Sequence, residues 1–169
     1  MNTTGPAHDA SLPEGRFQGP VAFGDLVRQA LECAAAEGWT HLMLSDPDFA
    51  DWPLGERRVV AALNAWAGAG RRIQFLAQDF GRLRDRHPRL VQWRVTWAHL
   101  VEAHAVRRRT SGDLPSAIWS PGWTLERLDI ERCVVVASRS SERRVALQER
   151  LQSCWQQGAP GFPATTLGL

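Results

Sequence analysis

Apolar positions recur every three or four residues in four parts of the chain, and this spacing predicts four amphipathic helices. Residues that commonly begin or end a helix flank each stretch. The first helix ends at Gly38, the second runs from near Pro53 to Gly68, the third opens at Pro88, and the last runs from Ser140 or Ser141 to Gly158.

Short apolar runs between these helices predict strands that are buried on both faces. Residues 41–45 and 72–77 are two such runs, and the second predicted helix joins them. A helix between two buried strands implies a right-handed crossover with the strands parallel. The expected fold class is therefore α/β, with a mixed, largely parallel central sheet and helices on both faces.

Three further segments complete the expected sheet. Residues 133–137 predict another buried strand, and residues 116–128 predict a bent strand or hairpin around the turn at Pro121 and Gly122. Residues 100–106 fit either the end of the third helix or a separate strand, and their periodicity favours neither.

The chain of 169 residues has the length of one domain. Residues 1–20 are rich in glycine and proline and predict a flexible or surface-draped arm. Residues 21–157 form the expected domain, and residues 158–169 form a tail that is unusually apolar for a chain end. The tail residues that we consider a candidate interface are Phe162, Leu167 and Leu169.

The amino-acid composition excludes some classes of function. A net charge of +2 is a weak bias, and all 20 basic residues are arginine, so no lysine-dependent mechanism is available. Cys33, Cys133 and Cys154 lie far apart, which favours reduced thiols over a zinc site. No apolar run reaches the roughly 18 residues of a membrane span. We expect a cytoplasmic protein with no metal, no cofactor and no membrane partner.

The order of the last predicted strand and the last predicted helix resembles that of a known protein family. Asp129 precedes the strand at 133–137, and Ala137 and Ser138 precede the final helix. From residue 21 to about residue 157 this order resembles one half of a phospholipase D-like domain. In that family a hairpin carries His, any residue, Lys, four residues and Asp, before a strand ending in Gly-Ser and then a helix. The chain also resembles a bacterial family that ends in the tail of residues 162–169.

The family's catalytic positions hold other residues here. Counting back from Asp129, the positions of histidine and lysine fall on Gly122 and Thr124. The family's chemistry uses an imidazole nucleophile and an ammonium that neutralises phosphate oxygens. The resemblance therefore implies a degenerate site and, from the pairing of two halves, a homodimer.

Aspartates follow the two strands that are expected to be parallel. Asp46, Asp48 and Asp51 follow the first and Asp79 follows the second, so they would share the carboxyl edge where α/β sheets bind ligands. The candidate ligand residues here are Asp46, Asp48 and Asp79. Aspartates also stabilise turns and cap helices, and that alternative is favoured.

Two weaker candidates come from residues 94–109. Glu102 and His104 would share a face of a strand, with His99 on the opposite face, so they are candidate ligand residues of low specificity. Arginines can hold phosphate oxygens, which makes the run beside Arg94 a candidate anion site. The run consists of Arg107, Arg108 and Arg109.

The leading hypothesis is a non-catalytic module that binds a protein partner or a second copy of itself, because the phosphodiesterase positions are vacant and the tail is apolar. An enzyme or small-ligand site at the acidic edge is the alternative. Nucleic-acid binding through the arginine run is a third and less favoured reading, since the run is short and lacks interleaved aromatic residues.

Overall fold

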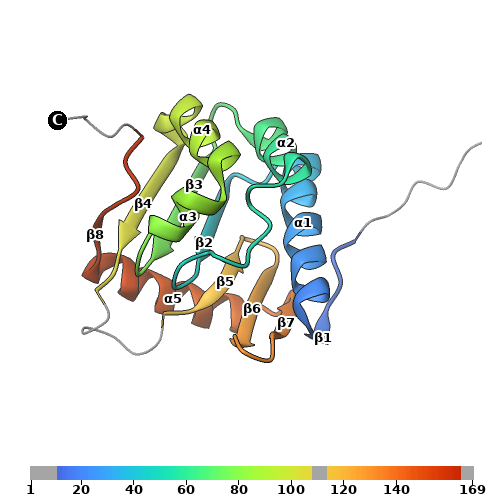
Figure 1. Cartoon of the computed structure of the whole chain (residues 1–169). Coiled ribbons are helices and arrows are strands. Elements are labelled where there is room, and N and C mark those ends of the chain that lie inside the picture. The colour runs from blue at the N-terminus through green and yellow to red at the C-terminus, as the bar shows by residue number, and fades with distance from the viewer. Residues whose placement is uncertain (1–10, 108–113, 165–169) are drawn as a thin grey trace, which may run out of the picture.

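The computed structural model describes residues 11–107 and 114–164. These residues form an eight-stranded sheet in the order β1-β7-β6-β5-β2-β3-β4-β8 (Figure 1). The strands are β1 (Gly15–Gln18), β2 (His41–Ser45), β3 (Arg72–Ala77), β4 (Val101–Ala105), β5 (Ser116–Trp119), β6 (Thr124–Asp129), β7 (Val134–Ser138) and β8 (Ala159–Pro160). The helices are α1 (Pro20–Glu37), α2 (Arg57–Trp66), α3 (Gly81–Arg86), α4 (Pro88–Thr96) and α5 (Ser141–Gln157).

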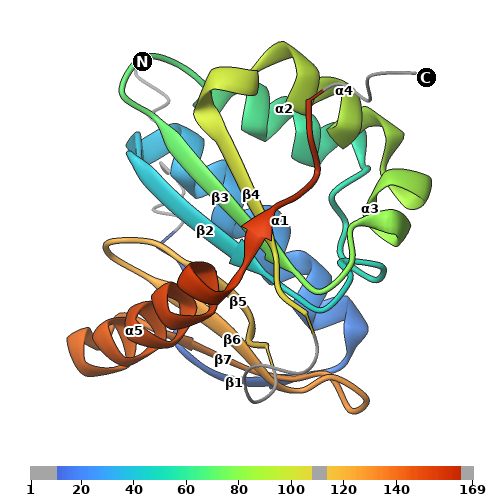
Figure 2. The ribbon, with the colours of Figure 1, turned by 90° about the vertical axis from the view of Figure 1, so that its left-hand side faces the viewer.

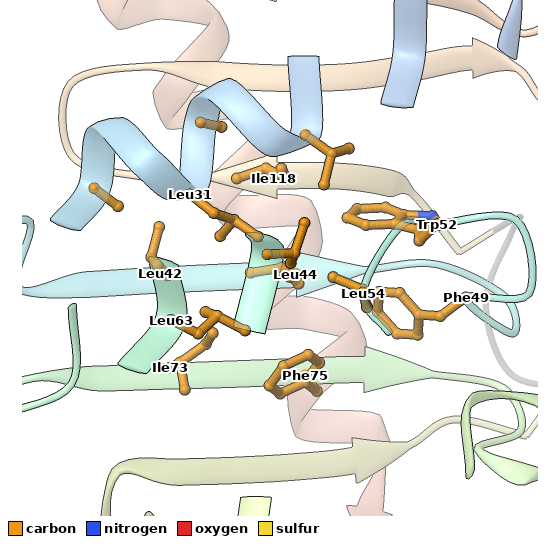
Figure 3. Packing of buried hydrophobic residues seen from close by; sticks show 14 of the residues in the cluster. Leu31, Leu42, Leu44, Phe49, Trp52, Leu54, Leu63, Ile73, Phe75 and Ile118 are labelled. Atoms are coloured by element: carbon orange, nitrogen blue, oxygen red, sulfur yellow. The ribbon is translucent and has the colours of Figure 1, made fainter. Parts of the chain in front are cut away.

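Helices cover both faces of the sheet. Helices α1 to α4 lie on one face and α5 crosses the other (Figure 2). The larger apolar core lies under α1 to α4, where Leu42, Leu44, Ile73 and Phe75 of the sheet meet helical residues such as Leu31 (Figure 3). A smaller core lies under α5.

The expected βαβ unit is present, but the expectation of a largely parallel sheet is wrong. β2 pairs with β3 in parallel, and β3 pairs with β4 in parallel. The other five pairings among the described residues are antiparallel. The physical reason is that β5, β6 and β7 follow one another through short turns, which reverse the chain at each step, and β5 then joins the edge of β2.

Residues 100–106 resolve into a strand rather than a helix. A short 3-10 turn at Ala98–Leu100 ends the helical path, and β4 then pairs with β3 along its length. The second helix begins at Arg57 and not near Pro53, because Phe49 and Pro53 first accept turn hydrogen bonds from Trp52 and Glu56.

Both chain ends contribute an edge strand. Within the expected arm, Gly15–Gln18 form β1 and pair with β7. Within the expected tail, Ala159–Pro160 form β8 and pair with β4. Phe162 is 1% exposed and stacks on Phe80 at 5.4 Å between ring centroids. The Phe162 ring therefore lies in the core of its own chain and is not available to a partner. Leu167 and Leu169 lie outside the described residues.

Candidate functional site

The carboxyl end of β2 carries a buried carboxylate, Asp46. Its Oδ2 accepts hydrogen bonds from the backbone amides of Asp48 at 3.1 Å and Phe49 at 2.8 Å. Its Oδ1 accepts from the Ser116 hydroxyl at 2.6 Å and from Nη2 of Arg127 at 2.9 Å. Four donors therefore surround this carboxylate, which is 1% exposed.

Arg127 of β6 is the partner that neutralises Asp46. Its side chain is 1% exposed and also binds Asp51, whose side chain is 53% exposed. The distances are 2.5 Å from Nη1 to Asp51 Oδ2 and 3.1 Å from Nη2 to Asp51 Oδ1. Nε donates to the Ser116 hydroxyl at 3.0 Å, and the guanidinium lies 4.3 Å from the Phe23 ring centroid.

The surroundings of Arg127 explain its charge state. Burial lowers the pKa of Arg127, but the hydrogen bond to Asp51 and the charges of Asp46 and Asp51 outweigh burial and raise it above its ordinary value. The guanidinium is therefore a permanent cation that holds two carboxylates. We interpret Asp46 and Arg127 as a pair that ties β2 to β6.

The other predicted acids of this edge also stabilise local structure. Asp48 accepts from the Ala50 amide at 2.9 Å and pairs with Arg82 at 3.3 Å. Asp79 accepts from the Gly81 amide at 2.8 Å, at the start of α3. Within residues 11–107 and 114–164, no three His, Cys, Asp or Glu side chains form a group that could hold a metal ion. The contacts of Asp46, Asp48 and Asp79 are those of turns and helix starts.

The two residues that the sequence resemblance places at the histidine and lysine positions of the phospholipase D motif, Gly122 and Thr124, lie beside the start of β6. Gly122 lies in an exposed turn, and the position its side chain would occupy has no neighbour within 4 Å. Thr124 is 3% exposed and its hydroxyl donates to the Ser138 carbonyl at 3.5 Å. Neither residue offers a nucleophilic imidazole or a cation.

Glu102 and His104 meet at a different place, a pocket of about 370 Å³ beside β4 and β8. Arg94 of α4 lines the same pocket. Glu102 is half exposed and pairs with Arg72 at 3.0 Å. His99 is not a member of this group; it is exposed beside the Trp97 ring.

Exposed arginines gather on α3 and α4. Arg82, Arg84, Arg86 and Arg89 are all exposed, and we call these four the arginine row. Three of them contact the segment that follows β2: Arg82 pairs with Asp48, Arg86 donates to the Ala50 carbonyl, and Arg89 donates to the Gly55 carbonyl. Only Arg82 of the row forms an ion pair within the part of the chain that the structure describes.

The predicted anion run is largely outside the described residues. Arg107 follows β4 and is exposed, whereas Arg108 and Arg109 fall in the undescribed segment 108–113. The arginine row was missed from the sequence because its members are spread over two helices. The available signal was charge: Asp85 is the only acid between residues 80 and 101, against five arginines.

The three cysteines are free thiols, with Cys133 and Cys154 buried. Burial and a hydrogen bond with Glu37 raise the pKa of Cys33 to about 11. The Cys33 thiol is therefore protonated at neutral pH and is a poor nucleophile.

Comparisons with known proteins identify the fold. No family model and no curated protein sequence matches the chain significantly. Among solved structures, the chain is similar to TrmBL2, an archaeal chromatin protein described with a novel mode of DNA binding. The TM-score is 0.66 at 13% identity, over 92% of this chain and 56% of that chain.

Two further solved structures are also similar. NucT from Helicobacter pylori gives a TM-score of 0.54 at 8% identity, over 88% of this chain and 99% of that one. Nuc from Salmonella typhimurium, a phospholipase D family member, gives 0.53 at 12% identity, over 88% and 97%. The chain therefore has a phospholipase D-like fold. No helix of the described residues has the length and apolar character needed to cross a bilayer.

Proposed function

We propose that this protein is a non-catalytic phospholipase D-like module that binds nucleic acid through the arginine row. The observation that carries the proposal is four exposed arginines within eight residues, of which one is ion-paired in the described chain. Guanidinium groups bind phosphate oxygens through two parallel hydrogen bonds, and such contacts dominate the affinity of proteins for nucleic acids. The expectation from the net charge of +2, that nucleic acid is an improbable partner, does not take this local concentration of charge into account.

The backbone that carries the arginine row is closely packed. Gly55 packs so closely on the junction of α3 and α4 that an added Cβ would lie 2.9 Å from the His87 ring and 3.2 Å from the Arg86 carbonyl. His87 is buried and its Nε2 lies 2.8 Å from the Phe49 carbonyl. This packing fixes the backbone that carries the arginines, so less freedom is lost when they bind.

The residues at the family's catalytic positions support the proposal that the protein is not a phosphodiesterase. The sequence resemblance places Gly122 and Thr124 at the family's histidine and lysine positions, and lysine is absent from the whole chain. Phosphodiester hydrolysis by that mechanism needs both groups. We expect purified protein to leave a labelled DNA substrate intact under conditions in which a phospholipase D-family nuclease cleaves it.

Binding is tested by fluorescence anisotropy with a short labelled DNA duplex and a short labelled RNA over a range of salt. We expect a dissociation constant of about 10⁻⁴–10⁻⁶ M for non-specific binding at physiological salt. The variant Arg84→Gln/Arg86→Gln/Arg89→Gln should bind at least about tenfold more weakly, and the slope of log K against log salt should fall by about 2 to 3.

A matched control separates local from overall charge. The variant Arg16→Gln/Arg132→Gln/Arg143→Gln removes the same charge from exposed positions elsewhere on the described surface. The control should bind within about twofold of the unmodified chain if the contacts are local. Equal losses in both triple variants, or no salt-dependent binding at all, would contradict the proposal.

Self-association is a second candidate, supported by the uneven covering of the sheet. One helix, α5, covers the face opposite α1 to α4 (Figure 2). Val145 on that helix is 50% exposed. We expect a homodimer by size-exclusion chromatography with light scattering, and Val145→Glu should weaken it. A monomer at all concentrations would exclude this candidate without affecting nucleic-acid binding.

The acidic-edge alternative has less support, because Asp46, Asp48 and Asp79 already accept hydrogen bonds from the chain. A ligand that binds the folded state must raise its stability. Magnesium should therefore leave the unfolding temperature unchanged, and a saturable rise would restore the alternative.

A further inference from the structure

The pocket beside β4 has walls from three separate parts of the chain. Arg94 comes from α4, Glu102 and His104 come from β4, and Pro160, Gly161 and Pro163 come from the segment after α5. β8, at the start of that segment, pairs antiparallel with β4 and forms the edge of the sheet. The pocket of about 370 Å³ is within the size range of small-molecule sites.

Close backbone contacts fix the wall that follows α5. The Gly161 amide donates to the Ala103 carbonyl at 3.0 Å. A Cβ at Gly161 would lie 3.3 Å from the Phe80 ring and 3.3 Å from the Ala105 side chain. The neighbouring Phe162 is buried against Phe80. The buried Phe162 therefore anchors this wall to the core.

Arg94 is a buried cation that has no carboxylate partner within 4 Å in residues 11–107 and 114–164. The residue is 8% exposed. Nε donates to the Phe162 carbonyl and Nη1 to the Ala98 carbonyl, each at 3.2 Å. Nη2 makes no hydrogen bond within the described chain, and burial lowers the pKa of Arg94. Burying a charge without a counterion is costly, so an anion at this position would be favoured.

His104 supplies a second oriented group. Its Nδ1 lies 2.8 Å from the Trp155 carbonyl, and because a carbonyl only accepts, Nδ1 carries the hydrogen. The imidazole also stacks on the Trp155 ring at 3.7 Å between centroids. Nε2 of the neutral ring is consequently left as a hydrogen-bond acceptor. Glu102, the carboxylate that lines the pocket, accepts a hydrogen bond from Nε of Arg72 at 3.0 Å. Arg72 therefore neutralises the negative charge of Glu102.

We propose that this pocket binds a small organic anion. A carboxylate or phosphate of the ligand pairs with Arg94, a hydroxyl of the ligand donates to Nε2 of His104, and its apolar part lies on Pro160, Gly161 and Pro163. No residue of the arginine row lines this pocket, so the proposal does not depend on nucleic-acid binding.

The test uses backbone amide chemical shifts of the full-length protein with three probes: meta-hydroxybenzoate, its neutral amide meta-hydroxybenzamide, and inorganic phosphate. We expect at least one of the two anions to shift the backbone amides of residues 102–104, Gly161 and Phe162 saturably, and the neutral amide to bind more weakly. If neither anion perturbs these amides, the proposal is overturned.

Variants assign the binding to the pocket. Arg94→Met should weaken the responsive anion about 10- to 100-fold, the range expected for a lost charge-assisted hydrogen bond. Two milder variants test the site should Arg94→Met fail to fold. Arg94→Lys keeps the positive charge but loses the planar guanidinium, and His104→Gln leaves Arg94 unchanged. Each should weaken binding by a smaller factor. The variant Arg16→Gln/Arg132→Gln/Arg143→Gln, which changes exposed residues outside the pocket, should bind the anion normally. Unchanged affinity in all three pocket variants would contradict the assignment.

Discussion

Two arginines of this protein are almost equally buried but have opposite surroundings. Arg127 is 4% exposed and binds the carboxylates of Asp46 and Asp51. Arg94 is 8% exposed, and its hydrogen-bond partners within the described chain are backbone carbonyls alone. The carboxylates raise the pKa of Arg127 above its ordinary value despite burial, whereas burial alone lowers that of Arg94.

The difference separates a structural cation from one that is available to a ligand. Arg127 has its counterions inside the fold, and its Nε, Nη1 and Nη2 all donate hydrogen bonds. Arg94 lines a pocket and has room for an anion. Burial of a charge does not by itself indicate function; the presence or absence of its counterion within the chain does.

The largest expected effect is that of Arg127→Met, which leaves Asp46 buried and unpaired. Removing one partner of a buried ion pair costs about 3–5 kcal/mol in the free energy of unfolding. Urea denaturation followed by circular dichroism measures this loss. A loss below about 1 kcal/mol would show that the pair does not hold β2 to β6.

The two carboxylates should differ from each other. Asp46→Asn removes the charge of a carboxylate that is 1% exposed, and we expect a loss of about 2–4 kcal/mol. Asp51→Asn changes a side chain that is 53% exposed and should cost about 1 kcal/mol or less. Urea denaturation measures the free energy of unfolding of both variants. Equal losses in the two would contradict the distinction between a buried and an exposed partner of Arg127.

Arg94→Met should destabilise the chain less than Arg127→Met. Two hydrogen bonds to carbonyls are lost, but no carboxylate of the described chain is left unpaired, so we expect about 1–3 kcal/mol. Arg94→Met and Arg127→Met make the same substitution at two buried positions, so each is a matched control for the other in one urea denaturation series. The reverse order would show that Arg94 is the structural cation.

The smallest effect is expected at an exposed pair, Arg28 with Glu56, which joins α1 to the start of α2. The hydrogen bond from Arg28 lowers the pKa of Glu56 below its ordinary value of 4.5. The pair therefore stabilises the fold above pH 4.5, and this contribution is lost as the pH falls through the lowered value. Glu56→Gln should cost about 0.2–1 kcal/mol at neutral pH and nothing in strong acid. A cost that grows as the pH falls would contradict this assignment.

Local sequence patterns predicted the elements that depend on local burial. The strands β2, β3 and β7 are short and mostly apolar, and α1 and α5 carry a periodic apolar stripe with residues suited to their ends. β1 and β8 were missed because they have no apolar pattern and exist only through pairing with β7 and β4. The short α3 buries Leu83 alone among its residues, which is too little for a periodic signal.

Pairing between distant parts of the chain limited the prediction of the site. Asp46 and Arg127 are far apart in sequence, and their contact depends on the position of β5 between β2 and β6. A signal was nevertheless present, because Arg127 shares the inward face of its strand with Leu125 and a charge on that face needs a partner. Arg94 likewise lies four residues after the buried Leu90 on the same helix.

The most direct test observes both arginines in one spectrum. Nε–H of Arg127 donates to Ser116, and Nε–H of Arg94 donates to the Phe162 carbonyl, so both groups should exchange slowly enough to be seen by proton–nitrogen NMR. Titration with meta-hydroxybenzoate and with phosphate should move the Arg94 signal for at least one anion and leave the Arg127 signal in place. A shift of Arg127, or no shift of Arg94 with either anion, would contradict the division of roles between these two cations.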